Sequence, residues 1–301
     1  MTSASTSAAC RKQYVDIGTG EKLAYLDKGD GDVILLLHGN MSSSLHLLPL
    51  FNRLPGGFRV IAPDLRGFGD STYNNRFDSI GELARDVKAL ADALGVVSAH
   101  VVGWSAGGGV ALALAAEYPG LVRGVFSVEG ASHRGYPLYK KNADNTSSAE
   151  PYGSKDALAL DPVAVAPCLA ATATQNAAFY DYICDLTLFP HNKPLPAERY
   201  TGEILKQRSL VDIDWALANF NMSSAPNAYR AGDGTVGRIK CPCVFTSGDT
   251  DYVVPPQMVA ENVAAIAGAR LIEYQRCGHS PFVDCPDRLT ADLLNFVGRK
   301  K

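Results

Sequence analysis

The stretch from Ala99 to Val110, AHVVGWSAGGGV, constrains the fold more than any other part of the chain. A short apolar run ends at Gly103, and an Ala/Leu-rich pattern with helical spacing begins after Gly107. Together they predict a buried strand that turns sharply into a helix, with Ser105 at the corner. Small residues at 103 and 107 suit such a corner because neighbouring backbone crowds it.

A corner of this kind exposes two reactive groups. It raises the Ser105 hydroxyl above the edge of the sheet, and it leaves the N–H of Ala106 free at a helix start, where developing negative charge can bind. The pattern G-x-S-x-G also occurs by chance, so a chemical role needs an acid, a base and a second N–H donor elsewhere. A dinucleotide site starting at Gly103 is excluded, because Ser105 stands where its second glycine is required.

Strand and helix patterns alternate on both sides of this stretch. Apolar strand patterns lie at 33–37, 58–63, 100–102 and 122–128, and helical patterns separate them. This order predicts an α/β fold with a doubly wound, mostly parallel sheet. The alternation stops near residue 130 and resumes near 231, a gap too long for a loop in a compact domain. We therefore predict an α/β core at 13–130 and 231–301, a helical, aromatic-rich cap at 131–230, and a disordered tail at 1–12.

Composition narrows the classes of function. The 301 residues are 47% hydrophobic and carry a net charge of −3 without a basic cluster, which argues against binding to nucleic acid or anionic membranes. No apolar run reaches the roughly 20 residues that span a bilayer. The first twelve residues contain no apolar stretch of the kind that secretory signals have, and the seven cysteines, an odd number, indicate reduced thiols. A cytoplasmic location is predicted, with a Ser/Ala-rich organellar transit peptide as the alternative; the oligomeric state is not readable.

His279 is the best placed of the six histidines to act as a base. It follows the last strand pattern, 270–274, in a Gly-His-Ser loop, and the carboxyl ends of parallel strands are where sites form. His38 also follows a strand, but it precedes a glycine in what reads as a structural turn. A serine hydroxyl needs a base that a third group orients, so an acid must lie near His279.

Asp251 is the predicted acid, because it lies just past a strand and gives the chain order Ser, Asp, His expected for this fold. Glu129, at the end of the preceding strand, is the alternative acid. The backbone N–H of Asn40, after the first buried strand, is the predicted second oxyanion donor beside that of Ala106. Trp104 and Met41 are expected to line the substrate pocket. No cofactor or metal site is predicted, since the Cys-Pro-Cys at 241–243 has no matching second pair for zinc.

Five motifs in this order resemble the α/β-hydrolase superfamily, in its capped esterase/lipase-like branch. They are His38-Gly39, Asp64-Leu-Arg-Gly-Phe-Gly-Asp-Ser71, Gly103-Trp-Ser-Ala-Gly107, Gly248-x-x-Asp251 and Gly278-His279. The resemblance covers roughly residues 20 to 299 apart from the cap. It implies an eight-stranded sheet, a lid between strands six and seven, and a cofactor-free hydrolase with Ser105, Asp251 and His279 as its triad.

A finer resemblance concerns the substrate. His-Gly-Asn-Met-Ser-Ser-Ser from 38 and Gly-Trp-Ser-Ala-Gly-Gly-Gly from 103 are similar to intracellular polyhydroxybutyrate depolymerases of the lipase-box type. The predicted reaction is hydrolysis of a small or oligomeric ester with an apolar or hydroxyacyl group. Cleavage of a carbon–carbon bond or perhydrolysis by the same triad, and a non-catalytic small-ligand receptor, are the alternatives. His-Gly-Asn also resembles haloalkane dehalogenases, but those use an aspartate where this chain has Ser105.

Overall fold

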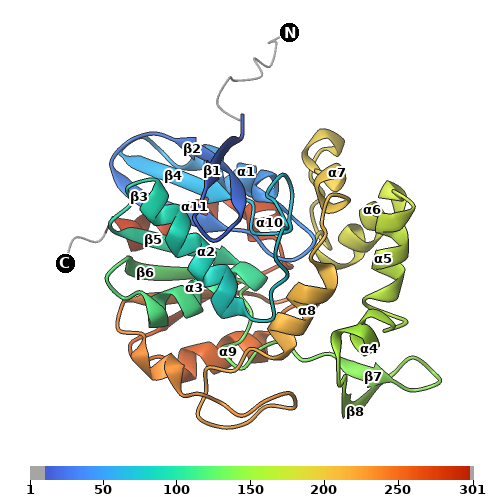
Figure 1. Cartoon of the computed structure of the whole chain (residues 1–301). Helices are drawn as coiled ribbons and strands as arrows, with labels where there is room; N and C mark the ends of the chain where they lie inside the picture. The colour runs from blue at the N-terminus through green and yellow to red at the C-terminus, as the bar shows by residue number, and fades with distance from the viewer. Residues whose placement is uncertain (1–10, 299–301) are drawn as a thin grey trace.

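An eight-stranded sheet forms the centre of the molecule in the computed structural model, which describes residues 11–298 (Figure 1). Its strand order is β1-β2-β4-β3-β5-β6-β9-β10. The strands are β1 (Gln13–Asp16), β2 (Lys22–Lys28), β3 (Asp32–Leu37), β4 (Phe58–Pro63), β5 (Ala99–Trp104), β6 (Val122–Val128), β9 (Cys243–Gly248) and β10 (Arg270–Tyr274). Strand β2 is antiparallel to both neighbours and the other pairs are parallel, which confirms the predicted fold class.

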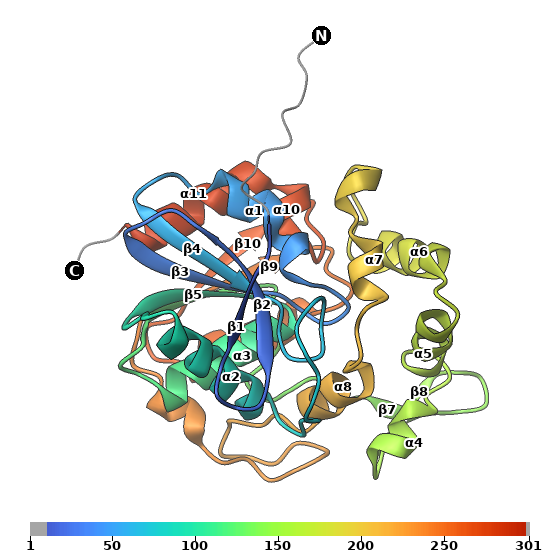
Figure 2. The same ribbon diagram turned by 45° about the horizontal axis from the view of Figure 1, so that its top comes forward.

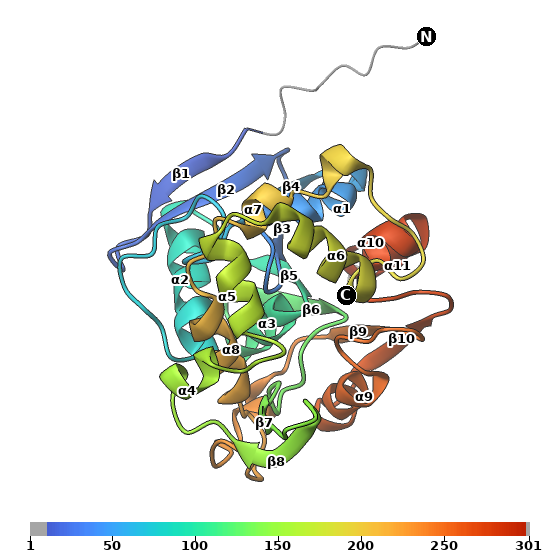
Figure 3. The ribbon, with the colours of Figure 1, turned by 90° about the vertical axis from the view of Figure 1, so that its right-hand side faces the viewer.

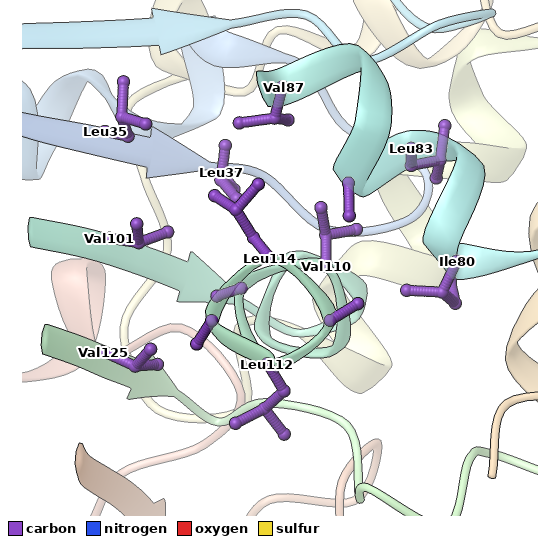
Figure 4. Close-up of a cluster of buried hydrophobic side chains, with 14 of the residues drawn as sticks. Leu35, Leu37, Ile80, Leu83, Val87, Val101, Val110, Leu112, Leu114 and Val125 are labelled. Carbon is purple, nitrogen blue, oxygen red and sulfur yellow. The ribbon is translucent and has the colours of Figure 1, made fainter. Parts of the chain in front are cut away.

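Helices cover both faces of the sheet (Figure 2). They are α1 (Leu48–Arg53), α2 (Ile80–Ala93), α3 (Ala106–Glu117), α9 (Pro256–Ala265), α10 (Pro281–Asp284) and α11 (Pro286–Val297). Alternate residues of a strand point to opposite faces. Leu35 and Leu37 of β3 therefore pack toward α2 and α3 (Figure 4), whereas Ile34 and Leu36 belong to the cluster that includes α1 and α11.

Close backbone contacts explain the glycines around the corner after β5. A Cβ atom on Gly103 would lie 2.3 Å from the carbonyl oxygen of Gly107, and one on Gly107 would lie 2.3 Å from the carbonyl oxygen of Leu37. No side chain fits at either position. Helix α3 can thus approach the strands closely, and residues 106–116 are all buried.

The segment that connects β6 to β9 in the sequence forms a separate layer. This layer lies in front of the central strands when the molecule is viewed from its side (Figure 3). It contains α4 (Lys155–Ala159), α5 (Ala166–Ala173), α6 (Ala177–Thr187), α7 (Thr201–Ile204), α8 (Leu210–Ala218), and a hairpin of β7 (Tyr139–Lys141) and β8 (Ser147–Pro151). We call residues 131–230 the cap, as in the sequence analysis. The hairpin is not predicted, because its strands are polar and partly exposed.

We predict a disordered tail at 1–12, and residues 1–10 of it lie outside the described part of the chain. At Lys12 the prediction is wrong. The Lys12 ammonium is 2.7 Å from Asp64, 2.8 Å from Asp70 and 2.5 Å from Glu203, so it joins the loop after β4 to α7 of the cap. Within residues 11–298, no helix is both long enough and apolar enough to cross a membrane.

Candidate active site

Ser105 occupies a strained corner between β5 and α3. Its backbone dihedrals, φ 55° and ψ −122°, lie in a region that costs a non-glycine residue about 1–3 kcal/mol. Hydrogen bonds hold the corner: the Ser105 N–H donates to the carbonyl of Val128 at 3.0 Å, and its carbonyl accepts from the N–H groups of Gly108 and Ala131. Strain that the surroundings maintain in this way is typical of a functional position. Ser105 is half-buried.

Both predicted oxyanion donors adjoin this corner. Ala106 is the first residue of α3, so its N–H has no acceptor within the helix. The turn after β3 passes directly over the serine, because a Cβ atom on Gly39 would lie 2.7 Å from Cβ of Ser105 and 3.2 Å from its Oγ. Asn40 is the next residue. The direction of the Asn40 N–H toward an oxyanion stays a prediction.

His279 and Asp251 form a buried pair. Nδ1 of His279 is 2.8 Å from Oδ2 of Asp251, and their side chains are 1% and 0% exposed. The other carboxylate oxygen accepts from the N–H groups of Val253 and Val254 at 2.7 and 2.9 Å. Because a carboxylate only accepts hydrogen bonds, Nδ1 carries the imidazole proton and Nε2 is left as the basic nitrogen.

Trp104 ties the histidine loop to the end of β5, which precedes Ser105. Its indole N–H donates to the carbonyl of His279 at 2.7 Å, and the two rings lie 5.6 Å apart. Since Trp104 directly precedes Ser105, the base lies next to the strand end that carries the serine. The indole is 2% exposed and also packs edge-on against Phe282. Met41 is half-buried. That Trp104 and Met41 line the substrate pocket stays a prediction.

Glu129, the alternative acid, is fully buried and points to β9 instead of to the imidazole. One carboxyl oxygen accepts from the N–H of Gly248 at 2.8 Å and the other from the hydroxyl of Thr246 at 3.1 Å. Burial, together with the negative charge of Asp251, raises the pKa of Glu129 well above its ordinary value. Glu129 is therefore held by β9, and Asp251 is the carboxylate that contacts His279.

His38 is a structural histidine. Its Nε2 accepts from the N–H of Leu65 at 3.0 Å, and its Nδ1 donates to the carbonyl of Gly39 at 2.7 Å. Burial lowers the pKa of His38, so the ring is neutral and both nitrogens are engaged. It fixes the turn that carries Asn40.

One acidic cluster in the described chain has a spacing suited to a metal ion, and it consists of Asp64, Asp70 and Glu203. The ammonium of Lys12 bonds to all three carboxylates. Lysine thus supplies the positive charge that this cluster requires.

Two cap residues that the sequence analysis did not identify contact Asn40. Gln207 and Asp214 hydrogen-bond to its side-chain amide. Neither belongs to a recognisable motif. The sequence offers one indication of Asp214: it is an acidic residue on the helix face that Leu210, Ile213 and Leu217 otherwise make apolar.

Comparison with known proteins places this geometry in a family. Residues 32–286 match the family described as alpha/beta hydrolase fold. The chain is 26% identical over 280 residues to lipase 1 of Psychrobacter immobilis, covering 92% of this chain and 80% of that protein. It is 29% identical over 286 residues to the 2-hydroxy-6-oxo-6-phenylhexa-2,4-dienoate hydrolase of Burkholderia cepacia, covering 89% of each.

A solved structure agrees on the fold. The esterase of Exiguobacterium antarcticum superposes with a TM-score of 0.72 at 21% identity, covering 96% of this chain and 100% of that one. The family match extends from the start of β3 to the start of α11 and includes the serine corner, the acid and the histidine loop. The chain therefore belongs to the α/β-hydrolase fold family.

Proposed function

We propose that this α/β-hydrolase is a serine hydrolase that cleaves carboxylic esters through an acyl-enzyme intermediate. The observation that carries the proposal is the buried His279–Asp251 pair, 2.8 Å apart, in a loop bonded to the residue that precedes the strained Ser105. A base with a fixed tautomer beside a raised serine is the arrangement that activates a hydroxyl at neutral pH.

In the first half of the reaction, Oγ of Ser105 attacks the ester carbonyl carbon while Nε2 of His279 takes the hydroxyl proton. The carbonyl oxygen becomes an oxyanion, and the N–H groups of Asn40 and Ala106 stabilise it by about 3 kcal/mol each. The ester C–O bond then breaks, and the imidazolium returns the proton to the leaving alcohol. Asp251 stabilises the imidazolium throughout.

In the second half, water attacks the acyl carbon of the Ser105 ester. Nε2 of His279 takes a proton from the water, the oxyanion forms in the same place, and the bond to Oγ breaks as the serine regains its proton. The products are the carboxylic acid and the free enzyme.

The aromatic residues of the cap favour an apolar or hydroxyacyl substrate, and the motif resemblance favours 3-hydroxybutyrate oligomers. A chain-length series of nitrophenyl esters, measured beside 3-hydroxybutyryl dimers and trimers, tests this choice. A higher kcat/KM for the hydroxybutyryl oligomers than for acyl esters of equal length would support a depolymerase. A preference for the plain acyl esters would indicate a general esterase.

Carbon–carbon bond hydrolysis is the second candidate. Its support is the similarity to the Burkholderia cepacia hydrolase and to a Paraburkholderia phymatum 2-hydroxy-6-oxononadienedioate/2-hydroxy-6-oxononatrienedioate hydrolase, which is 27% identical and covered over 98% of both chains. A 2-hydroxy-6-oxo-dienoate added to the panel decides between the two reactions, because its cleavage bleaches a conjugated chromophore. Hydrogen peroxide in place of water as the second nucleophile tests for perhydrolysis. A cytoplasmic location is part of the proposal.

A further inference from the structure

The side chain of Asn40 connects the nucleophile's surroundings to the cap. Its Nδ2 donates to Oδ1 of Asp214 at 2.9 Å, and its Oδ1 accepts from Nε2 of Gln207 at 2.8 Å and from the N–H of Met41 at 2.8 Å. Both ends of the amide are therefore engaged. Asp214 belongs to α8 and Gln207 lies just before it, so the two partners come from one segment of the cap.

Gln207 also holds the backbone that follows Asn40. Its Oε1 accepts from the N–H of Met41 at 3.1 Å, which gives Gln207 one bond to each of two successive residues. Met41 has φ 48°, in the left-handed region that a residue with a branched or long side chain rarely adopts. A turn with this strain needs outside support to keep its shape. Gln207, which is 5% exposed, supplies that support.

Asp214 is placed to orient the Asn40 amide rather than to balance a charge. Within residues 11–298, the bond from Asn40 is the single hydrogen bond of its carboxyl group, and no cation is paired with it. Removing an acid from water without a cation partner lowers stability. A carboxyl oxygen accepts from the NH2 end of the amide, so it fixes which end of Asn40 lies toward Asp214 and which lies toward Gln207.

The position of this turn matters because Gly39 lies against Ser105. A shift of the turn by a few tenths of an ångström moves the backbone N–H of Asn40 relative to the oxyanion, and catalytic rates are sensitive to such shifts. We propose that Gln207 and Asp214 are positioning residues that hold the Asn40 turn in the geometry needed for the oxyanion hole. This inference rests on the proposed function of Ser105 as nucleophile.

A purely structural alternative makes a different prediction. If the two residues only fasten the cap, their loss lowers the fraction of folded protein, and each folded molecule reacts at the normal rate. If they position the turn, every molecule stays reactive but reacts more slowly. The rate constant and the amplitude of covalent labelling separate these cases.

The experiment measures labelling of Ser105 by a fluorophosphonate probe, whose phosphonyl oxygen occupies the oxyanion site as phosphorus bonds to Oγ and fluoride leaves. The variants are Asp214→Ala, Asp214→Asn and Gln207→Ala. The matched control is Asp156→Ala, which removes an exposed acid from α4 of the cap. The same proteins are assayed for kcat and KM on nitrophenyl butyrate.

We expect the labelling rate constant and kcat to fall at least about tenfold in Asp214→Ala and Gln207→Ala, with KM and the final labelled fraction nearly unchanged. Asp214→Asn keeps an acceptor for Asn40 and is expected to recover most of the rate. Three results would each overturn the inference. The first is a labelling rate constant within about twofold of the parent in both alanine variants, and the second is a loss confined to the labelling amplitude or to KM. The third is an equal loss of rate in Asp214→Asn and Asp214→Ala.

Two further outcomes have a defined meaning. If Asp214→Ala does not fold, Gln207→Ala decides the question by the same criteria, because it removes both bonds to the turn without leaving a charge. If the parent protein does not label at Ser105, the proposed function fails and the positioning role fails with it. A parent that labels normally beside unaffected variants removes the positioning role alone.

Discussion

Nδ1 of His279 and Oδ2 of Asp251 lie 2.8 Å apart, both beneath the protein surface, in loops that follow two neighbouring parallel strands. The contact fixes the imidazole tautomer, because the carboxylate can only accept a hydrogen bond. Replacing Asp251 by Asn lets the opposite tautomer form, with the proton on the nitrogen meant to act as base. We expect kcat for ester hydrolysis to fall by about 10⁴ with KM little changed, measured at saturating substrate.

Glu129 provides the matched comparison for that variant. Burial raises the pKa of Glu129 well above its ordinary value, and Glu129→Gln keeps the shape of the side chain and one acceptor oxygen. We expect kcat of Glu129→Gln to stay within about threefold of the parent, since a neutral acceptor still reaches Gly248. A loss as large as that of Asp251→Asn would mean that Glu129 acts as a charged acid.

The turn over Ser105 leaves no room for a side chain at residue 39. A methyl group added by Gly39→Ala would lie 2.7 Å from Cβ of Ser105 and must displace either the serine or the turn. We expect kcat to fall about 10- to 100-fold, because such a displacement disturbs both the nucleophile and the Asn40 donor. Gly153→Ala, where an added methyl meets nothing within 4 Å, is the control and should leave kcat unchanged.

Asp214 gives stability a distinct pH dependence. Burial, with a contribution from the charge of Asp161, raises the pKa of Asp214 to about 7, whereas the unfolded chain releases this proton near 3.8. Between these values the folded state holds a proton that the unfolded state has lost. The free energy of unfolding therefore falls as pH rises from about 4 to 7, by at most about 1.4 kcal/mol per pH unit from this group, and levels off above 7.

Urea unfolding at pH 5 and pH 8 measures that effect. Asp214→Asn removes the titrating group, so we expect the variant to lose less stability than the parent between the two pH values. The exposed-acid control, Asp156→Ala, should follow the parent at both. If the free energy of unfolding changes by the same amount between pH 5 and pH 8 in Asp214→Asn and in the parent, Asp214 has an ordinary pKa in the folded protein.

Lys12 links the loop after β4 to the cap. The substitution Lys12→Ala removes the cation that the buried carboxylates of Asp64 and Glu203 share. Because an unpaired buried carboxylate destabilises the folded state, we expect the free energy of unfolding to fall by about 3–5 kcal/mol. Lys88→Ala removes a more exposed pair with Asp92 and should change stability by about 0.5 kcal/mol or less. Equal, small losses in both variants would contradict the role of Lys12 as an anchor.

Much of the fold could be predicted from helix-capping residues and apolar strand runs, because helix ends need hydrogen-bond partners and central strands are buried on both faces. The capping box at Ser79 and Glu82 predicts the start of α2, and both reciprocal hydrogen bonds are present. Continuous apolar runs predict the central strands, because both faces of a parallel sheet are covered. The polar β7–β8 hairpin and the buried Lys12 carry no such pattern, since tertiary contacts alone determine their positions.

The sequence predicts the candidate site from the order of the strands. Ser105, Asp251 and His279 each follow a parallel strand, and the structure brings Asp251 and His279 into contact. The chain order Ser, Asp, His favours Asp251 over Glu129, but both residues follow strands at the same edge of the sheet, and the side-chain contacts of the structure are what separate them. Gln207 and Asp214 were not predictable, since their contacts depend on how the cap lies over Asn40.

The turnover of a Ser105→Ala variant on a nitrophenyl ester tests the central claim most directly. The account predicts that kcat falls by at least about 10⁴, with the folded state and the free energy of unfolding preserved, because the acyl-enzyme can no longer form. A purified, folded variant that retains more than about a tenth of the parent turnover would contradict the assignment of Ser105 as the nucleophile.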